Sequence, residues 1–267
     1  MKNNKIILWF ALIVTAIIPV YAQQYDSEKD FQIDWDKNVK DGVMIVKYLG
    51  TKKEVSIPPS IQNYPVTGIG YMAFSYNKNI TKVTIPNNVT SIGDFAFFYC
   101  TSLTNITIPN NVTSIGKMAF QGCTSLASVS IPNSVKSIGE LAFQDCTSLV
   151  SVSISNSVDS IYEHAFYRCT KLTSVTIGNS VDYIWYGAFE DCTSLASVTI
   201  PSNVTNIWYN AFSGCTSLTS VTFQGTILSK NFQDDSFPGD LRIKYLASDG
   251  GPGTYKRFAG GTTWRKQ

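Results

Sequence analysis

A unit of 23 residues repeats along the chain and limits what the chain can fold into. The six cysteines are spaced 23 residues apart throughout, at positions 100, 123, 146, 169, 192 and 215. The residues around them repeat too, so that IPNNVTSIGDFAFFYCTSLTNIT is followed by IPNNVTSIGKMAFQGCTSLASVS and IPNSVKSIGELAFQDCTSLVSVS. A diverged unit over 55–84 precedes six regular copies, which end at Thr222. Such a period predicts a solenoid of stacked coils, each contacting only its neighbours.

One unit has too few apolar residues to close a core alone, so neighbouring coils must share one. In the second regular copy the recurring apolar positions are Ile108, Val112, Ile115, Ala119, Phe120, Cys123, Leu126 and Val129. The L-x-x-V-x-I spacing that begins at Leu126 predicts a strand with one buried face, ended by the Pro and Asn that follow. The Ala-Phe pair lies in a segment too short for a full helix, where we expect a helical turn.

The consensus L-x-x-V-x-I-P-x-x-V-x-x-I-G-x-x-A-F-x-x-C resembles the BspA-like, or Treponema pallidum-type, leucine-rich repeat. The resemblance covers residues 55–222, and the end of the chain is similar to the C-terminal end of spirochaete members. It implies the α/β class: a right-handed, curved leucine-rich-repeat solenoid with a parallel β-sheet on its concave side and short strands or helical turns elsewhere. It also implies an exported bacterial protein that binds host or neighbouring-cell proteins.

Residues 1–22 have the layout of a signal peptide. Two lysines precede an apolar run from Ile6 to Val20, and the small Ala22 stands before Gln23. The alternative is an uncleaved membrane anchor, but a run of about 15 residues is short for a bilayer span. We therefore expect a mature chain without a transmembrane segment that is secreted, periplasmic or on the cell surface.

The ends of the chain must shield the open edges of the solenoid. Residues 23–54 are predicted to form an N-terminal capping region, because Phe31–Trp35 and Val43–Val46 alternate like the strands of a hairpin. Residues 55–222 form the repeats and residues 223–267 the C-terminal cap. In that cap we expect a short helix over 240–246 and a final hairpin of 255–258 and 262–266. The fold is thus predicted to have hairpin-like caps at both ends.

Charge and composition argue against several classes of function. Without the signal peptide, 19 cationic residues balance 19 anionic ones, which predicts no nucleic-acid partner. The only histidine, His164, stands at a variable position where we expect a surface residue, and one imidazole makes a Cys/His metal cluster or a serine triad untenable. The other titratable residues are scattered, whereas catalysis needs unlike groups that converge. We expect no catalysis and no cofactor.

The six cysteines allow three disulfides in an exported protein. Equivalent residues of stacked strands are, however, related by a translation of roughly 4.8 Å. A disulfide needs Cβ atoms about 3.8 Å apart with converging bonds. We therefore expect six buried free thiols that pack as small apolar side chains. A zinc site is a poorer alternative, because Cys-x₂-Cys spacing is absent.

The outward positions of the concave strand form two columns of small hydroxyl side chains. Candidate residues for a partner-binding face there are Ser128, Ser151, Ser174, Ser197, Ser220, Thr176, Thr199 and Thr222. The simplest interpretation is a solvated face of a strand. The alternatives are a flat protein-docking surface and, least favoured, a hydroxyl array of the kind found in ice-binding solenoids.

Bulky aromatic residues replace glycine in the later copies, at the position after the second conserved Ile. The column holds Gly70, Gly93, Gly116 and Gly139, and then Tyr162, Trp185 and Trp208. Together with nearby tyrosines, the candidate partner-binding residues are Tyr162, Tyr183, Trp185, Tyr186, Trp208 and Tyr209. Rigid aromatic side chains on a neutral surface are typical of recognition sites. The alternative is that they pack on one another or under the C-terminal cap.

These observations favour an exported leucine-rich-repeat module that binds protein partners, such as an adhesin or surface interaction protein. The alternative is a structural or self-associating envelope component without an external ligand. The sequence leaves the identity of the partner, the binding face and the oligomeric state open.

Overall fold

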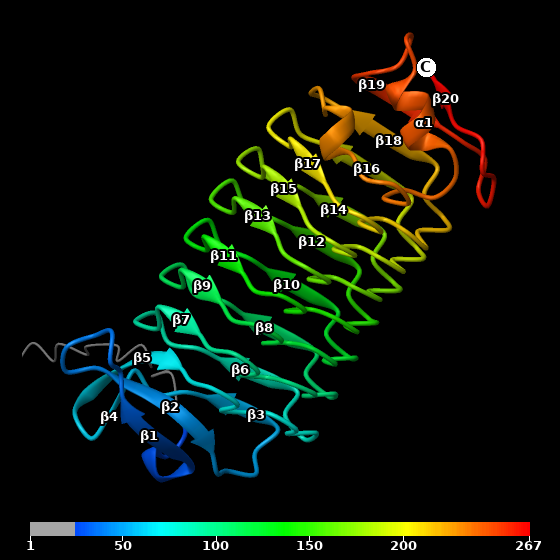
Figure 1. Cartoon of the computed structure of the whole chain (residues 1–267). Helices are drawn as coiled ribbons and strands as arrows, with labels where there is room; N and C mark the ends of the chain where they lie inside the picture. Colours follow the sequence, from blue (N-terminus) through cyan, green and yellow to red (C-terminus); the bar gives the residue numbers. More distant parts are fainter. Residues whose placement is uncertain (1–24) are drawn as a thin grey trace, which may run out of the picture.

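The computed structural model describes residues 25–267, so the predicted signal peptide over 1–22 lies outside the described residues. The described chain forms a solenoid of parallel strands with a cap at each end (Figure 1). Each regular coil contributes one strand to each of two ten-stranded sheets. This arrangement confirms the solenoid, the parallel sheet and the short strands elsewhere in the coil. The region boundaries at residues 54 and 222 stay predictions.

We call the two sheets A and B. In spatial order sheet A contains β1 (Phe31–Trp35), β2 (Val43–Tyr48), β5 (Tyr64–Ile69), β7 (Ser91–Ile92), β9 (Ser114–Ile115), β11 (Ser137–Ile138), β13 (Ser160–Ile161), β15 (Tyr183–Ile184) and β17 (Asn206–Ile207), and β4 (Ser60–Ile61) pairs with β5. Sheet B contains β20 (Arg265–Lys266), β19 (Gly253–Lys256), β18 (Ser220–Phe223), β16 (Ser197–Ile200), β14 (Ser174–Thr176), β12 (Ser151–Ser153), β10 (Ser128–Ser130), β8 (Asn105–Thr107), β6 (Lys82–Thr84) and β3 (Glu54–Ser56). Within residues 25–267 the only α-helix is α1 (Leu241–Leu246), and short 3-10 segments cover Glu28–Asp30 and Ser229–Asn231.

The strands of sheet B pair with a register of one repeat, so equivalent residues of successive coils lie side by side. Ser128 of β10 is the partner of Asn105 in β8 and of Ser151 in β12. Val129 is buried between the exposed Ser128 and Ser130, as the alternating pattern predicts for a strand with one buried face. Residues that are 23 positions apart in the sequence therefore form a column of neighbouring residues along the solenoid.

The Ala-Phe segment forms a series of turns that stop short of a helix. Within a coil, the amide of Phe98 donates to the carbonyl of Phe95 at 3.0 Å. The amide of Phe97 instead donates to Ala119 of the next coil at 2.7 Å. Phe95 and Tyr99 have φ of 58° and 53°, which breaks any run of right-handed helical residues. Hydrogen bonds between coils thus replace those that would extend a helix.

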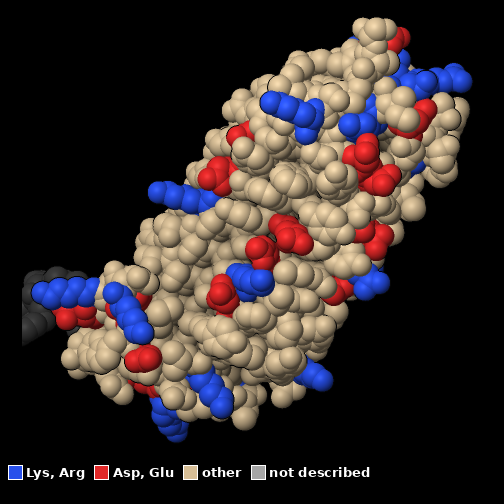
Figure 2. All heavy atoms as spheres, in the orientation of Figure 1, with Lys and Arg blue, Asp and Glu red and all other residues tan. Residues whose placement is uncertain are grey.

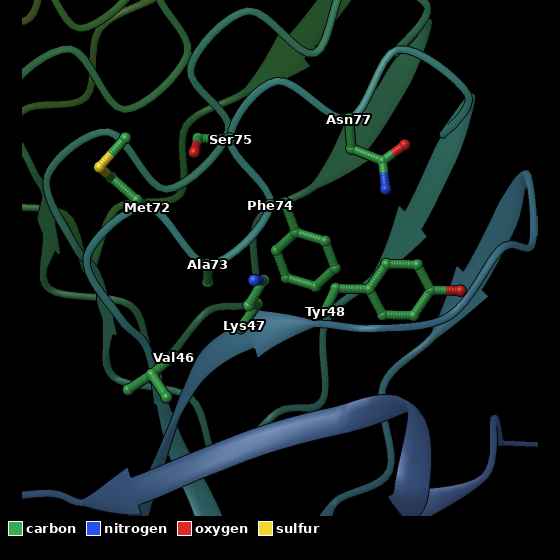
Figure 3. A pocket seen from close by; sticks show the side chains of 8 residues that line it. All are labelled: Val46, Lys47, Tyr48, Met72, Ala73, Phe74, Ser75 and Asn77. Carbon is green, nitrogen blue, oxygen red and sulfur yellow. The ribbon is translucent and has the colours of Figure 1, made fainter.

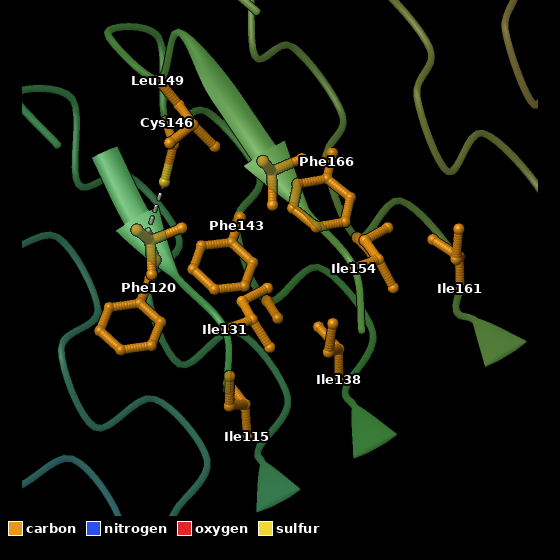
Figure 4. Close-up of a cluster of buried hydrophobic side chains, with 14 of the residues drawn as sticks. Ile115, Phe120, Ile131, Ile138, Phe143, Cys146, Leu149, Ile154, Ile161 and Phe166 are labelled. Carbon is orange, nitrogen blue, oxygen red and sulfur yellow. Dashed lines mark hydrogen bonds between the residues drawn. The ribbon is translucent and has the colours of Figure 1, made fainter. Parts of the chain in front are cut away.

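The core is a continuous stack of phenylalanine rings, one from each coil. The rings are Phe74, Phe97, Phe120, Phe143, Phe166, Phe189 and Phe212, with centroids 5.0 to 5.3 Å apart. Figure 4 shows three of them one above another beside the stacked isoleucines. The predicted apolar positions of the second regular copy are all buried. Because each ring is covered by the next, no single coil has a core of its own.

All six cysteines are buried free thiols, as predicted. Each thiol donates to the carbonyl oxygen of the phenylalanine of the preceding unit, at 3.0 Å from Cys100 to Phe74 and 3.2 Å from Cys146 to Phe120 (Figure 4). Burial raises the pKa of the Cys100 thiol to about 12 and holds the pKa of the other five thiols well above the ordinary thiol value. The thiols therefore pack as neutral side chains with one weak hydrogen bond each.

Each end of the solenoid carries a hairpin, which confirms the expected hairpin-like ends, and each cap adds an aromatic ring to the ring stack. At the N-terminal end β1 and β2 pair antiparallel, and the Tyr48 ring stacks on Phe74 at 5.4 Å. At the other end β19 and β20 pair antiparallel, and Phe237 stacks on Phe212 at 4.6 Å. The short helix expected over 240–246 is present as α1. The caps thus replace the missing neighbouring coil with an aromatic ring of their own.

Candidate functional site

The glycine column lies where successive coils approach closely. A Cβ atom built on Gly139 would lie 2.6 Å from the backbone nitrogen of Lys117, and one on Gly93 would lie 3.0 Å from the carbonyl oxygen of Ile69. Neither glycine has a positive φ. Close packing of the backbone, rather than an unusual conformation, therefore explains glycine in the early coils. The later coils accommodate Tyr162, Trp185 and Trp208 at the same position.

These bulky residues form an aromatic ladder along coils four to six, which we define as Tyr162, Tyr183, Trp185 and Trp208. The Trp185 ring stacks on Trp208 with centroids 4.9 Å apart and planes 18° apart. It also lies parallel to Tyr162 at 6.5 Å and to Tyr183 at 5.6 Å. The predicted side chains are thus brought together, and mutual packing accounts for part of their arrangement. The Nε1 atom of Trp185 is buried without a hydrogen-bond partner in the described structure.

Two further tyrosines stand beside the ladder with much of their surface in solvent. Tyr186 and Tyr209 are 37% and 45% exposed. Within the ladder, Tyr162 is also 37% exposed. The Tyr186 and His164 rings are perpendicular with centroids 4.9 Å apart, and the Tyr186 hydroxyl accepts a hydrogen bond from Asn210 at 3.4 Å. These contacts fix the position of the Tyr186 ring while leaving its outer surface available.

His164 is more engaged than the surface residue that the sequence predicts. Its side chain is half-buried, with Nε2 3.5 Å from a carboxylate oxygen of Glu190 and Nδ1 3.7 Å from one of Glu163. Arg168 lies 3.9 Å from Asp191 on the same side. The side of the solenoid next to the aromatic ladder therefore carries several carboxylates.

The candidate hydroxyl residues lie on the outer face of sheet B. Ser128, Ser151, Ser174, Ser197, Thr176 and Thr199 are exposed. Ser220 and Thr222 are half-buried, because β19 pairs with β18 and the Thr254 hydroxyl lies 2.9 Å from that of Thr222. The hydroxyl face is thus continuous over the middle coils and ends under the C-terminal cap.

A second aromatic cluster lies at the other end of the solenoid and was not found from the sequence. Its members are Tyr71, Tyr76, Phe95, Phe98 and Tyr99, with Tyr71 and Tyr76 63% and 57% exposed. Tyr71 meets Phe95 at 5.6 Å, and Tyr76 meets Phe98 at 5.3 Å. Tyr76 and Tyr99 also belong to one column, which an inspection of every column for aromatic residues would have shown.

The described residues line pockets of about 260 to 410 Å³. A pocket of about 280 Å³ lies where β2 replaces a coil beside Phe74 (Figure 3). There the backbone amide of Tyr48 donates to the carbonyl of Ala73 at 2.8 Å. Within residues 25–267 no three His, Cys, Asp or Glu side chains are placed to hold a metal ion. None of the helices in that range is long and apolar enough to cross a membrane.

Comparison of the sequence with models of known protein families identifies the family of this solenoid. A model of the BspA type leucine rich repeat region matches residues 67–196 and 113–244, which together span more than half of the chain. The chain belongs to the BspA-type leucine-rich-repeat family. This membership confirms the resemblance inferred from the 23-residue consensus.

The chain is also similar to three solved structures of bacterial leucine-rich-repeat proteins. A leucine rich cell surface protein from Faecalibacterium prausnitzii is 31% identical with a TM-score of 0.67, and the match covers 90% of this chain and 60% of that one. The leucine-rich-repeat protein of T. pallidum is 30% identical with a TM-score of 0.61, covering 85% and 98%. A leucine-rich repeat protein from Eubacterium ventriosum is 34% identical with a TM-score of 0.59, covering 64% and 45%. The comparison with curated proteins gave no match.

The chain therefore spans less than two thirds of the length of the F. prausnitzii protein and about all of the T. pallidum protein. Functions of the unmatched parts of the F. prausnitzii and E. ventriosum proteins are therefore not assigned to this chain.

Proposed function

We propose that this BspA-type chain is an exported module that binds protein partners at a cell surface, with an adhesive role. The chain is 31% identical to a leucine rich cell surface protein, and this similarity supports a surface location. A repeated scaffold spreads side chains along an axis, which suits an extended interface. The binding surface we assign is the aromatic ladder with Tyr186 and Tyr209.

The observation that carries this proposal is the replacement of glycine by aromatic residues in one column. Gly93, Gly116 and Gly139 show that the coil can be built with no side chain at that position. Tyr162, Trp185 and Trp208 therefore add a feature that the coil geometry does not require. Large, rigid aromatic side chains that stay partly exposed are enriched at the centres of protein interfaces.

The ladder favours a protein partner over a stacked sugar. Sugars bind to aromatic side chains through the ring faces, but the faces of Trp185 are paired with neighbouring rings. A partner instead meets ring edges and the tyrosine hydroxyls, together with the nearby carboxylates of Glu163 and Glu190. This combination fits a protein surface with hydrogen-bond donors and basic side chains.

The experiment measures binding of the purified protein to a panel of matrix, plasma and neighbouring-cell surface proteins. The double variant Tyr186→Ser, Tyr209→Ser should lose at least about tenfold in affinity for any partner found. The matched control is Tyr71→Ser, Tyr76→Ser, which removes two exposed tyrosines from the other end of the solenoid. Equal loss in both variants, or loss only on changing Ser151 and Ser174 of sheet B to Glu, would refute the assignment of the aromatic ladder.

Analytical ultracentrifugation distinguishes the alternative of a self-associating component. The proposal expects a sedimentation coefficient that does not change with protein concentration. Concentration-dependent association, together with no binding to any member of the panel, would favour the structural alternative instead.

Export is tested at the N-terminus of the protein recovered from its source. We expect the mature chain to begin at Gln23, after removal of residues 1–22. A chain that retains Met1 in the membrane fraction would contradict export by a cleaved signal peptide.

A further inference from the structure

The C-terminal cap presents the most exposed large apolar side chain of residues 25–267. Phe258, in the loop between β19 and β20, is 89% exposed, whereas the tyrosines beside the aromatic ladder are half-exposed or less. The residues that follow it, Ala259, Gly260 and Gly261, add no apolar bulk. One phenyl ring thus stands alone on the loop at the end of the molecule.

The loop that carries Phe258 is held firmly against the last coil. The backbone amide of Arg257 donates to Thr219 at 3.0 Å, and the guanidinium donates to the carbonyls of Leu218 at 2.6 Å and of Cys215 at 3.1 Å. The same guanidinium stacks over the buried Trp264 ring at 5.0 Å. The exposure of Phe258 is therefore built into a fixed hairpin, so the ring is presented before any partner arrives.

Two cations lie opposite each other on the same hairpin. Lys256 of β19 pairs directly with Arg265 of β20, and both side chains are exposed. Like charges directly opposite in an antiparallel pair repel each other. Neither side chain forms an ion pair within the described residues. Figure 2 shows Lys and Arg side chains at this end of the molecule, with Asp and Glu side chains among them. The hairpin thus places two cationic side chains side by side, and neither is paired with a carboxylate within ion-pair distance in the described structure.

The exposed ring and the cations line one pocket. It has a volume of about 410 Å³, and its lining residues are Lys256, Arg257, Phe258, Thr263, Arg265 and Gln267. No carboxylate side chain is among them. The Thr263 hydroxyl and the Gln267 amide supply neutral hydrogen-bonding groups. An apolar wall beside paired cations is complementary to a ligand that carries an apolar group next to carboxylates.

We propose that this pocket docks an acidic peptide segment of a protein partner, which places an apolar side chain against Phe258 and carboxylates against Lys256 and Arg265. The site is separate from the aromatic ladder and does not rest on the function proposed for it. A peptide fits better than an anionic membrane, because the ring lines a concavity and the neighbouring loop residues offer nothing more to insert.

The test uses fluorescence anisotropy of labelled EEFEE peptide with the purified protein, and KKFKK as the charge-reversed control. EEFEE should bind more weakly as salt rises from about 0.05 M to about 0.5 M, because exposed charges are screened. Phe258→Ser should weaken binding by about tenfold or more. The double variant Lys256→Glu, Arg265→Glu should remove detectable binding.

Matched controls come from the same cap. Ile243→Ser and Lys244→Glu change an apolar side chain that is 68% exposed and an exposed cation on α1, neither of which lines the pocket. Both controls should bind EEFEE like the unchanged protein, and all variants should keep its thermal unfolding midpoint.

Three results would overturn the proposal. The first is no binding of EEFEE up to about 1 mM peptide. The second is equal binding of KKFKK, or binding that is unchanged in the Phe258 and Lys256/Arg265 variants. The third is sedimentation of the protein with phosphatidylglycerol vesicles that depends on Phe258, which would assign the pocket to a membrane.

Discussion

Between successive coils, a buried cysteine thiol meets the carbonyl oxygen of the preceding coil's phenylalanine in the interior of the solenoid. Cysteine is a small side chain that packs in the core, and its weak S–H donor is satisfied by the Phe carbonyl of the preceding unit. The carbonyl of Phe97 accepts both the Cys123 thiol and the backbone amide of Cys100. One residue type thus fills volume and adds a hydrogen bond between coils.

The buried thiols should make the fold sensitive to alkali. The Cys100 thiol ionises near pH 9 when exposed, but burial raises its folded-state pKa to about 12. Its contribution to stability is therefore fully present below pH 9 and is lost as pH rises toward 12. Above pH 9 the free energy of unfolding should fall by up to about 1.4 kcal/mol per pH unit more in the unchanged protein than in Cys100→Ala.

Urea unfolding of both proteins between about pH 7 and pH 10.5 measures this difference. Because tyrosines titrate in both proteins, only the difference between the two curves reports on Cys100. Parallel curves over the whole range would contradict a buried, neutral thiol at this position.

Among the elements, the sequence predicts best where repetition makes the environment uniform. The strand of sheet B, the burial of the cysteines and the hairpins at the ends follow from alternation and spacing, and the structure confirms them. The turn expected around Ala96 and Phe97 is present, and it does not grow into a helix because left-handed residues interrupt the run and the next coil takes the amide hydrogen bonds. Propensity alone does not reveal bonds to a neighbouring coil.

Only part of the candidate site can be predicted from the sequence, because only departures from a repeated column stand out in it. The aromatic ladder was found because Trp185 and Trp208 break a glycine column, and the structure does bring these rings together. The cluster around Tyr71 and Tyr76 was missed because Tyr71 belongs to the diverged unit. Non-repeating contacts, such as those of Arg257, leave no periodic signal in one sequence.

The glycine column should tolerate side chains only in the later coils. In Gly139→Val the new Cβ would lie 2.6 Å from the Lys117 nitrogen, so the coils must separate. We expect a loss of about 1–3 kcal/mol in the free energy of unfolding. The matched control Tyr162→Val, in the same column one coil later, should cost less. Urea unfolding measures both losses of unfolding free energy. Equal losses would contradict the prediction, because they would show that the two coils pack alike at this position.

The stability of the C-terminal hairpin of β19 and β20 should depend on the planar guanidinium of Arg257. Arg257 donates to several backbone carbonyls and stacks over Trp264, which a lysine ammonium cannot reproduce. Arg257→Lys should lower the free energy of unfolding by about 2–3 kcal/mol. Hydrogen exchange should also speed up at the Tyr255 amide of β19. Lys256→Ala is the control, and unchanged exchange in Arg257→Lys would contradict this role.

Across the whole molecule, two sets of aromatic residues run along the same axis with different surroundings. The phenylalanine stack is buried and continues from Tyr48 in one cap to Phe237 in the other. The aromatic ladder is partly exposed and occupies only the later coils. The stack therefore holds the solenoid together, whereas the ladder is an addition that we assign to partner binding.

The most direct test compares the free energy of unfolding of Phe212→Ala and Trp208→Gly, two variants within the same coil. Phe212 is fully buried, and Trp208 stands where earlier coils have glycine. The account predicts a loss of about 3–5 kcal/mol for Phe212→Ala and less than about 2 kcal/mol for Trp208→Gly. An equal or larger loss for Trp208→Gly would show that the ladder is part of the core and would contradict its assignment as a binding surface.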